Sequence, residues 1–569
     1  MLKKIFHLII IALLSVSTIR SQTTSGTDFW LTFGRNWAVY PGDLQIRIVG
    51  GDEATTGTIE FTELGTSVPF SLSPYEVYTY NLDNDQKNAV YNTNMGISDK
   101  SIHITTHNNK AVTVYAMNQQ GATTDATNIL PITALGTEYY QISYAPLSLG
   151  DSYAVVATEN DTKISHNGEI PIPLNKGEVY YCTSATDMTG AHITSNKFVA
   201  FFALCVLTGI PPYGGTADHL YQQLAPVHTW GYNFFVPTSH LGIERVRIVA
   251  SKNGTKIDQI GGDFIYSSSG GYTIDAGQYI ELEVLLDNNG CFIQSDNPIG
   301  VCTYLTSYTY NGSGLLISDP AQAWLPAIEQ TAPNALIAPF IPIGVTNLTD
   351  HYAIVMTYTD AAPYTEVSIG GGTPMPLSGG YGWYDNSDAE MSFYIMPLTN
   401  LNDSYYFTND AGLIVLCYGV GPLESYYYLA GSSMRNLSAA FSANGVPYTE
   451  MTGDYLFCEN EITFTTAITG ASEMDSLRWY ISAHNSTVLV HDPLLDDLET
   501  WTRTFKAGNY LVKMEVYHNG EPEPLVYEGT LCVGAWIKLS PRPGGGGSAP
   551  FINDCFKVGT ILYPVAIPN

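Results

Sequence analysis

The chain has 569 residues, of which 45% are hydrophobic and only 13% charged, so it is long enough for several domains with apolar cores. Its formal net charge is −30 at pH 7. A field of that sign repels nucleic acid and anionic membranes, which excludes nucleic-acid binding as an expected function, and it attracts cations. Asp83–Asp85 and Asp492–Asp497 are acidic runs that could bind calcium, but neither has the full spacing of a calcium loop, so we expect no cofactor.

The first residues have the pattern of a secretory signal peptide. Lys3 and Lys4 form a basic start, and an apolar run from Leu8 to Leu14 follows. This run is too short to span a bilayer, and no later stretch reaches the length of a membrane helix. We therefore predict a signal peptide over residues 1–21 and an exported mature chain, secreted or at the cell surface, without a transmembrane segment.

A long unit then repeats itself about four times. Its clearest copies are Thr189–Phe202 and Asn289–Cys302, with an earlier copy at Lys100–Val114 and a degraded one at Tyr405–Cys417. Each copy reads as strand, polar turn, strand, and the 40 tyrosines and 52 glycines also favour strands and turns. We predict an all-β fold of tandem antiparallel sandwich-like repeats, with a propeller-like closure of the repeats as the alternative. The expected units are 23–120, 121–215, 216–312 and 313–430.

Residues 440–536 have a different character. Ser476–Tyr480 is an alternating strand that carries a tryptophan, and Phe505–Val516 is a turn followed by strict alternation. This region resembles the immunoglobulin-like modules of bacterial surface proteins, including the polycystic-kidney-disease (PKD-like) type, although Ile481–His484 replaces their usual Asp-Gly turn. The Gly/Pro-rich tail, 537–569, contains Pro541–Ser548, which we interpret as a flexible linker.

Eight cysteines in an exported chain predict disulfide bonds, although their connectivity cannot be deduced from sequence. The candidate pairs are Cys182 with Cys205 and Cys291 with Cys302, because each pair brackets the strands of one repeat, and Cys458 with Cys532, which bracket the C-terminal module.

Asp218 and His219 are the residues that acid–base chemistry would use first. The alternative is structural, with Asp218 capping a short helical turn and His219 packed where two repeats meet. His103 and His107 offer a weaker metal pair, and no HExxH or GxSxG motif occurs. We favour the structural interpretation and expect no catalytic, cofactor or metal site.

Two segments, Asp187–Lys197 and Asp218–Gly231, together with Thr27–Trp30 and Ile248–Ser251, resemble the IgG Fc-binding protein N-terminal domain family. The likeness covers roughly 25–430 and implies a bacterial member of the Bacteroidetes type, since many bacterial members occur in Bacteroidetes. The family usually has a cysteine just before its Asp-His-Leu, where this chain has Ala217. The resemblance therefore implies that the family's local disulfide is altered or absent here.

The resemblance and the repeats imply a non-enzymatic binding or adhesion protein that recognises a host or mucus glycoprotein, such as an immunoglobulin Fc or a mucin. Asp218, His219, Trp230 and Gly231 form its structural motif, and the segment that holds them is expected to organise a junction between repeats. The alternatives are a secreted glycan-binding or glycan-active protein, or an architectural subunit of the cell surface.

Overall fold

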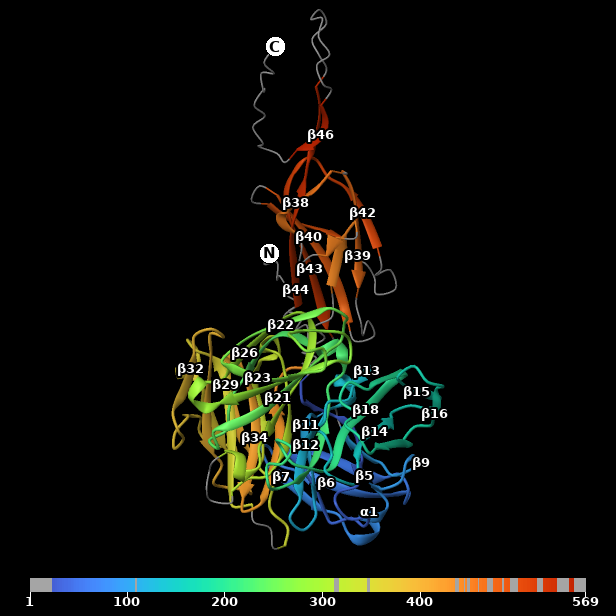
Figure 1. Ribbon diagram of the computed structural model, residues 1–569, viewed down its shortest axis with the longest axis vertical. Coiled ribbons are helices and arrows are strands. Elements are labelled where there is room, and N and C mark those ends of the chain that lie inside the picture. The colour runs from blue at the N-terminus through green and yellow to red at the C-terminus, as the bar shows by residue number, and fades with distance from the viewer. Residues whose placement is uncertain are drawn as a thin grey trace, which may run out of the picture. The chain divides into compact units, whose positions relative to one another are not determined.

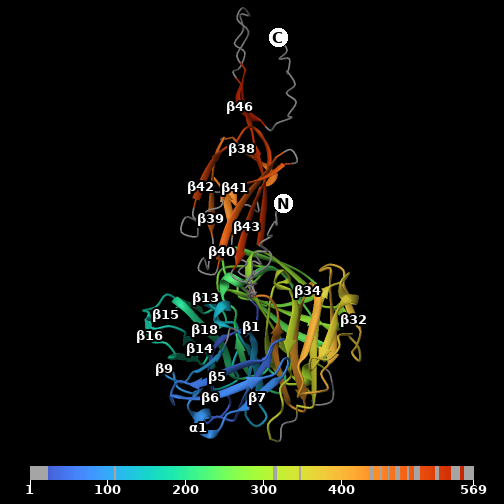
Figure 2. The same ribbon diagram turned by 180° about the vertical axis from the view of Figure 1, so that it is seen from behind.

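The computed structural model describes residues 23–107, 110–311, 317–344 and 348–434 and, further along, 440–444, 446–447, 451–458, 460–467, 474–483, 486–491, 500–518, 525–539 and 552–556. The predicted signal peptide (1–21), the acidic run Asp492–Asp497 and the Pro541–Ser548 segment lie outside these residues. The chain divides into two compact units, one of Gln22–Ser438 and one that holds Ala439–Asn569 (Figures 1 and 2). Both are built from sheets in which nearly all strands pair antiparallel, which confirms the predicted all-β class.

Unit Gln22–Ser438 contains four structural repeats, defined here by strand pairing. Repeat 1 comprises β1 Ser25–Gly26, β2 Asp28–Leu31, β3 Phe33–Gly34, β4 Asp43–Gly50, β5 Thr55–Phe61, β6 Thr66–Leu72, β7 Val77–Asn81, α1 Asn84–Asn88, β8 Tyr91–Asn92, β9 Gly96–Ser98, β10 Ile102–Thr106, β11 Val112–Gln119 and β12 Thr124–Ile129. Repeat 2 comprises η1 Ile132–Ala134, β13 Gly136–Tyr140, β14 Asp151–Ala157, β15 Thr162–His166, β16 Ile172–Leu174, β17 Val179–Ser184, β18 His192–Thr208 and β19 Asp218–Gln223.

Repeat 3 comprises η2 Val227–Thr229, β20 Gly231–Val236, β21 Ile243–Ala250, β22 Thr255–Ile260, β23 Gly262–Ser267, β24 Thr273–Ile274, β25 Tyr279–Leu285, η3 Leu286–Asn288, β26 Cys291–Leu305, α2 Tyr308–Asn311 and β27 Ala321–Leu325. Repeat 4 comprises η4 Ile328–Gln330, β28 Ala332–Ile337, β29 Asp350–Tyr358, η5 Ala362–Tyr364, β30 Glu366–Ile369, β31 Met375–Pro376, β32 Trp383–Asn386, β33 Met391–Pro397, β34 Tyr405–Gly421 and β35 Glu424–Gly431.

Repeats 2, 3 and 4 share one plan around a long strand, which is β18, β26 or β34. In repeat 2, the first half of β18 pairs with β13 and β15, and its second half pairs with β14 and β19. The second halves of the long strands are almost wholly buried, as the apolar run Phe198–Val206 predicts. One strand thus connects an outer half-sheet to an inner one, and the last strand of each repeat lies innermost.

The four innermost strands close the repeats into a ring. Strand β12 contacts β19 and β35, and β27 contacts the same two strands. The N-terminal segment completes the closure, because the Thr24 amide donates to the Ser432 carbonyl at 3.3 Å. In addition, β9 of repeat 1 pairs with β17 and forms an edge of the sheet of repeat 2. The repeats are therefore joined to their neighbours and do not form a string of separate modules.

The second unit contains β36 Ala440–Ala443, β37 Val446–Pro447, β38 Thr452–Phe457, β39 Glu461–Ala467, β40 Met474–Ala483, β41 Ser486–His491, β42 Thr500–Thr504, β43 Gly508–His518, β44 Leu525–Val533, β45 Ala535–Leu539 and β46 Ile552–Phe556. One sheet has the order β37-β36-β39-β42 and the other the order β38-β44-β43-β40-β41. A single apolar core that includes the fully buried Trp479 fills this unit. Among the described residues of the whole chain, no helix has the length and apolar character needed to cross a membrane.

Candidate functional site

Asp218 and His219 lie in β19 and are fully buried, so the short helical turn expected there is wrong. The Asp218 carboxylate accepts hydrogen bonds from the backbone amides of Thr124 at 2.6 Å and His219 at 2.7 Å. Thr124 belongs to the innermost strand of repeat 1, so this carboxylate joins two repeats. Its contact with His219 is through the backbone, and the two side chains do not form an acid–base pair in this arrangement.

Both ring nitrogens of His219 have partners. Nδ1 lies 2.8 Å from the Cys205 carbonyl oxygen, which can only accept, so Nδ1 carries the proton. Nε2 then accepts from the Asn118 side-chain amide of repeat 1 at 3.1 Å. Burial lowers the pKa of His219 to about 4, so the imidazole is neutral near pH 7 and serves as a hydrogen-bonding link between repeats.

At the centre of the ring, one carboxylate accepts hydrogen bonds from all four repeats. Oδ1 of Asp125 accepts from the amides of Ala126 at 2.8 Å and Tyr427 at 3.1 Å, and Oδ2 accepts from those of Tyr221 at 3.0 Å and Gln322 at 3.2 Å. These amides belong to β12, β35, β19 and β27. Burial raises the pKa of Asp125, and the four N–H donors act in the opposite direction. Asp125 is therefore the central link between the four inner strands.

Three more buried carboxyls lie near the starts of the inner strands. Asp218, Asp319 and Glu424 come from repeats 2, 3 and 4, and each leaves one buried oxygen without a hydrogen-bond partner among the described residues. Burial raises the pKa of Asp319 and of Glu424 to about 7, and it raises the pKa of Asp218 well above its usual value. Across the described part of the chain, no three His, Cys, Asp or Glu side chains are grouped so that they could hold a metal ion.

Trp230 lies where repeats 2 and 3 meet. Its Nε1 donates to the Ala225 carbonyl at 3.1 Å, and its ring lies beside those of Tyr140 and Trp324, with centroids 5.8 and 6.1 Å away. A Cβ on Gly300 would stand 2.6 Å from the Trp230 ring, so only glycine fits below the indole. The next residue, Gly231, begins β20 and pairs with Ile299. All four motif residues are thus buried, and Asp218, His219 and Trp230 each contact a neighbouring repeat.

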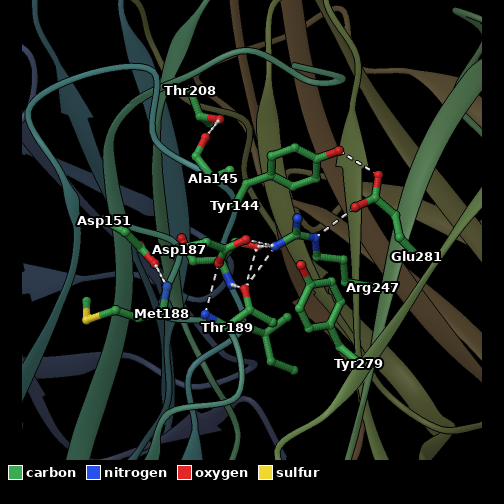
Figure 3. Close-up of polar contacts among 12 residues, drawn as sticks. Tyr144, Ala145, Asp151, Asp187, Met188, Thr189, Thr208, Arg247, Tyr279 and Glu281 are labelled. Atoms are coloured by element: carbon green, nitrogen blue, oxygen red, sulfur yellow. Dashed lines mark hydrogen bonds and ion pairs between the residues drawn. The ribbon is translucent and has the colours of Figure 1, made fainter. Parts of the chain in front are cut away.

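Arg247 is the centre of a second junction between repeats 2 and 3 (Figure 3). Its guanidinium donates to Asp187 Oδ2 at 2.8 Å, to the Ser143 carbonyl at 2.8 Å and to Glu281 Oε2 at 3.1 Å. Tyr144 and Tyr279 place their rings 3.9 and 4.6 Å from the guanidinium carbon, and Tyr144 also donates to Glu281 at 2.6 Å. The fully desolvated cation is therefore paired, hydrogen-bonded and stacked.

The ring repeats this junction on its other side. Arg47 occupies in β4 the place that Arg247 has in β21, because Tyr115 opposite Arg47 corresponds to Cys302 opposite Arg247. Arg47 donates to the carbonyls of Pro339 and, at 2.7 Å, Leu401, both in repeat 4. Burial lowers its pKa to about 10. The Arg-Ile-Val sequence shared by both strands, Arg47–Val49 and Arg247–Val249, was the sequence signal for both sites, and it was missed.

The two candidate metal histidines do not share a site. His103 stacks on Trp30 with centroids 4.0 Å apart, and its Nε2 lies 2.9 Å from Asp28. His107 instead lies 3.3 Å from the hydroxyl of Thr56.

The three predicted disulfide pairs are wrong, because Cys182, Cys205, Cys291, Cys302 and Cys532 are all free. Cys182 and Cys205 lie on opposite sides of β14, two strand spacings apart, which is about 9.6 Å and beyond the reach of a disulfide. Cys291 and Cys302 lie on the single extended strand β26 and so cannot meet. Cys458 is disulfide-bonded, but not to Cys532.

A family profile described as IgGFc binding protein matches residues 125–419, more than half of the chain. The Homo sapiens IgGFc-binding protein is 29% identical over 199 residues, a match that covers 31% of this chain and only 4% of that protein.

The crystal structure of the N-terminal eight Ig domains of Down Syndrome Cell Adhesion Molecule isoform 1.30.30 aligns over 90% of this chain and 86% of that one, at 8% identity. Its TM-score of 0.11 is too low to support any argument about fold. The family match begins at Asp125, the central carboxylate of the ring, and continues through the inner strands of repeats 2 and 3. On this evidence the chain belongs to the IgGFc binding protein family.

Proposed function

We propose that the chain is an exported bacterial protein, secreted or held at the cell surface, that binds or adheres to a host or mucus glycoprotein. Immunoglobulin Fc is the first candidate ligand. Membership of the IgGFc binding protein family and the likeness to the human IgGFc-binding protein support a binding role. The signal-peptide pattern in residues 1–21 supports export.

The observation that carries this proposal is that the candidate ionisable side chains are buried at the boundaries between repeats. Asp125, Asp218, His219 and Arg247 are buried and hydrogen-bonded across repeat boundaries, so they stabilise the ring. A rigid ring of this kind holds its loops in fixed positions, which suits recognition of a partner because little conformational entropy is lost on binding. We propose on the same ground that the protein is not an enzyme.

We further propose that the second unit is an immunoglobulin-like module. Parallel pairing of β38 with β44 beside β43, β40 and β41 follows the order expected for strands A′, G, F, C and C′. The buried Trp479 lies on β40, the position of strand C, where such sandwiches place their core tryptophan.

The test uses the purified chain from residue 23 to residue 569. Its binding to human IgG Fc, to Fab as the matched control and to purified mucin is measured by biolayer interferometry. Saturable binding to Fc or mucin, with no release of reducing sugar from the mucin, is expected. Release of sugar that is abolished by a single Asp→Asn or Glu→Gln substitution would show that the protein is an enzyme and would refute the proposal.

A further inference from the structure

A short turn recurs in repeats 1, 2 and 3, and in each of them it lies against the neighbouring repeat. Its copies are residues 73–76, 175–178 and 275–278, which directly precede β7, β17 and β25. In each copy the fourth side chain accepts a hydrogen bond from the amide of the first residue. The pairs are Glu76 with Ser73 at 2.7 Å, Glu178 with Asn175 at 2.5 Å, and Gln278 with Asp275 at 2.8 Å. The three turns are therefore versions of one structural element.

The third residue of this turn has a left-handed backbone in all three copies, and in two of them it is glycine. Gly177 and Gly277 have φ angles of 86° and 77°. A Cβ on them would stand 3.0 Å from Thr62 and 2.7 Å from the Gly190 carbonyl oxygen, so the neighbouring repeat leaves no room there. Repeat 1 instead has Tyr75 at this place, with a φ of 61°. A bulky side chain in this conformation is unfavourable, and such strain is typical of functional positions.

Repeat 4 holds Tyr75 in this conformation. The Ser404 hydroxyl donates to the Tyr75 carbonyl at 2.6 Å. The rings of Tyr75 and Tyr406 lie 5.6 Å apart, and a Cβ on Gly371 would stand 2.9 Å from the Tyr75 ring. Tyr75 is therefore fixed at the junction where repeat 1 closes the ring on repeat 4.

A cavity of about 430 Å³ lies at this junction, and we call it the closing pocket. Residues 73–77 of repeat 1 line one side of it, and Gly370, Asn402 and Asp403 of repeat 4 line the other. Its volume is in the range of small-ligand pockets and exceeds the space that a single ion needs.

The closing pocket is lined by two carboxylates and no basic group. Glu76 accepts from the Ser73 amide through Oε2, and Asp403 accepts from the Asn400 side-chain amide through Oδ2. Each carboxylate is thus oriented by one oxygen and keeps the other for a ligand. Among the described residues that line the pocket none is Lys, Arg or His, and neither carboxylate forms an ion pair with a described residue.

The charges around the closing pocket do not neutralise these carboxylates. Beside the turn, Asp52 and Glu53 are exposed, and Lys110 forms its ion pair with Glu53. On the side of repeat 4, the Arg47 guanidinium donates to the Leu401 carbonyl at 2.7 Å and to neither carboxylate. The region therefore keeps a net negative charge, and a concave site of one sign concentrates ligands of the opposite sign.

We propose that the closing pocket binds a basic side chain, a lysine ammonium or an arginine guanidinium, that projects from the partner protein. This rests on the proposed binding function. Glu76 and Asp403 accept hydrogen bonds from the cationic group, the Tyr75 ring lies beside it, and Pro74 and Val77 contact its aliphatic stem. Two carboxylates provide fewer oxygens than a calcium ion requires, which favours an organic cation.

The experiment removes the charge of the closing pocket and keeps its hydrogen bonds. In Glu76→Gln/Asp403→Asn the amide oxygens still accept from Ser73 and Asn400, as the amide oxygen of Gln278 does in repeat 3. The matched control, Glu63→Gln/Glu169→Gln, removes two exposed charges outside the pocket. Melting temperature and circular dichroism verify that both variants fold.

The first probes are acetylated and amidated pentapeptides with a central arginine, a central lysine or a central citrulline, the neutral isostere of arginine. Ligand-observed NMR measures their binding to the chain from residue 23 to residue 569. We expect a basic peptide to bind at least about fivefold more tightly than the citrulline peptide. The pocket variant should weaken that binding at least about tenfold and the control should leave it within roughly twofold. Equal binding of the citrulline peptide, or equal binding by the pocket variant, overturns the proposal.

Tyr75→Gly tests the aromatic wall separately. Gly177 and Gly277 already occupy this place in the same turn, so the variant should melt no lower than the unaltered chain. It should nevertheless bind the basic peptide about threefold more weakly, because the ring beside the cation is lost. A lower melting temperature with unchanged binding would show that Tyr75 acts only in the fold.

Human IgG Fc and purified mucin separate this inference from the proposed function. Both are tested after lysine acetylation, which removes the charge, after reductive methylation, which keeps it, and after arginine modification with phenylglyoxal. We expect acetylation or phenylglyoxal, but not methylation, to weaken binding at least about tenfold, and the pocket variant to lose as much. Unchanged binding of Fc or mucin by the pocket variant overturns the assignment of the pocket while the binding function stands. Binding of the basic peptide alone, without Fc or mucin, overturns the proposed ligand and leaves the pocket assigned.

Discussion

Replacing Asp125 with alanine tests the claim that one carboxylate holds the ring together. The substitution leaves four buried amides, one from each inner strand, without an acceptor. A buried donor that loses its partner costs about 1–3 kcal/mol, so we expect the free energy of unfolding to fall by at least about 4 kcal/mol. Asp125→Asn retains one acceptor oxygen and should lose about half as much. The double variant Asp125→Ala/Ala321→Asp transfers the carboxylate from β12 to the corresponding position in β27. It should recover part of the lost free energy of unfolding.

The free energy of unfolding is measured by urea denaturation, with tryptophan fluorescence and circular dichroism as two probes. Glu63→Ala, at an exposed turn of repeat 1 without a positive φ, is the matched control and should change stability by less than about 0.5 kcal/mol. If Asp125→Ala remains within about 1 kcal/mol of the unaltered chain, the four hydrogen bonds do not determine the stability of the ring. In that case the junction at Arg247 would have to account for it.

Three further predictions concern other buried groups. Arg247→Met leaves the buried Asp187 without its cation, while Glu281 keeps its ion pair with Arg245, so we expect the free energy of unfolding in urea to fall by about 3–5 kcal/mol, whereas a loss below about 1 kcal/mol would contradict a structural role. Trp230→Ala should lower the melting temperature, because it leaves a cavity above Gly300 and destabilises the fold by about 3–5 kcal/mol. An unchanged melting temperature would show that Trp230 does not stabilise the junction. Burial raises the pKa of Asp319 to about 7 from 3.8, so its proton binds more tightly in the folded state and stability is lost as pH rises from about 4 to about 7. The free energy of unfolding of Asp319→Asn, measured relative to that of the unaltered chain, should therefore rise by up to about 4 kcal/mol between about pH 4 and about pH 8. A difference that does not change with pH would show that Asp319 does not have a raised pKa in the folded state.

The strands of this fold could be predicted from sequence because their local patterns are strong. An alternating pattern identified Ser476–Tyr480, which lies in β40, and the repeated strand-turn-strand unit indicated antiparallel sheets. These are properties of neighbouring residues in one segment of chain. Such local patterns can therefore be recognised without knowledge of what packs against the segment.

The innermost strand β19 was misread as a helical turn because it is polar and yet buried. Gln222 donates to the Thr127 hydroxyl at 2.8 Å, and Gln223 accepts from the Leu130 amide at 2.9 Å, so repeat 1 supplies the partners for the polar side chains of β19. Hydrophobic periodicity cannot detect a core of this kind. The same limit explains the disulfide predictions, since the spacing of Cys291 and Cys302 does not show whether a chain turns between them or continues straight.

The central carboxylate also constrains how such a protein can arise by duplication. Four identical copies would bring either no carboxylate or four to a space that accommodates one, and four would repel one another strongly in the dry interior. The corresponding residues here are Leu220, Ala321 and Ser425, none of them ionisable. A ring of this design thus requires its ancestral copies to diverge at this position, so perfect internal symmetry would be incompatible with its own centre.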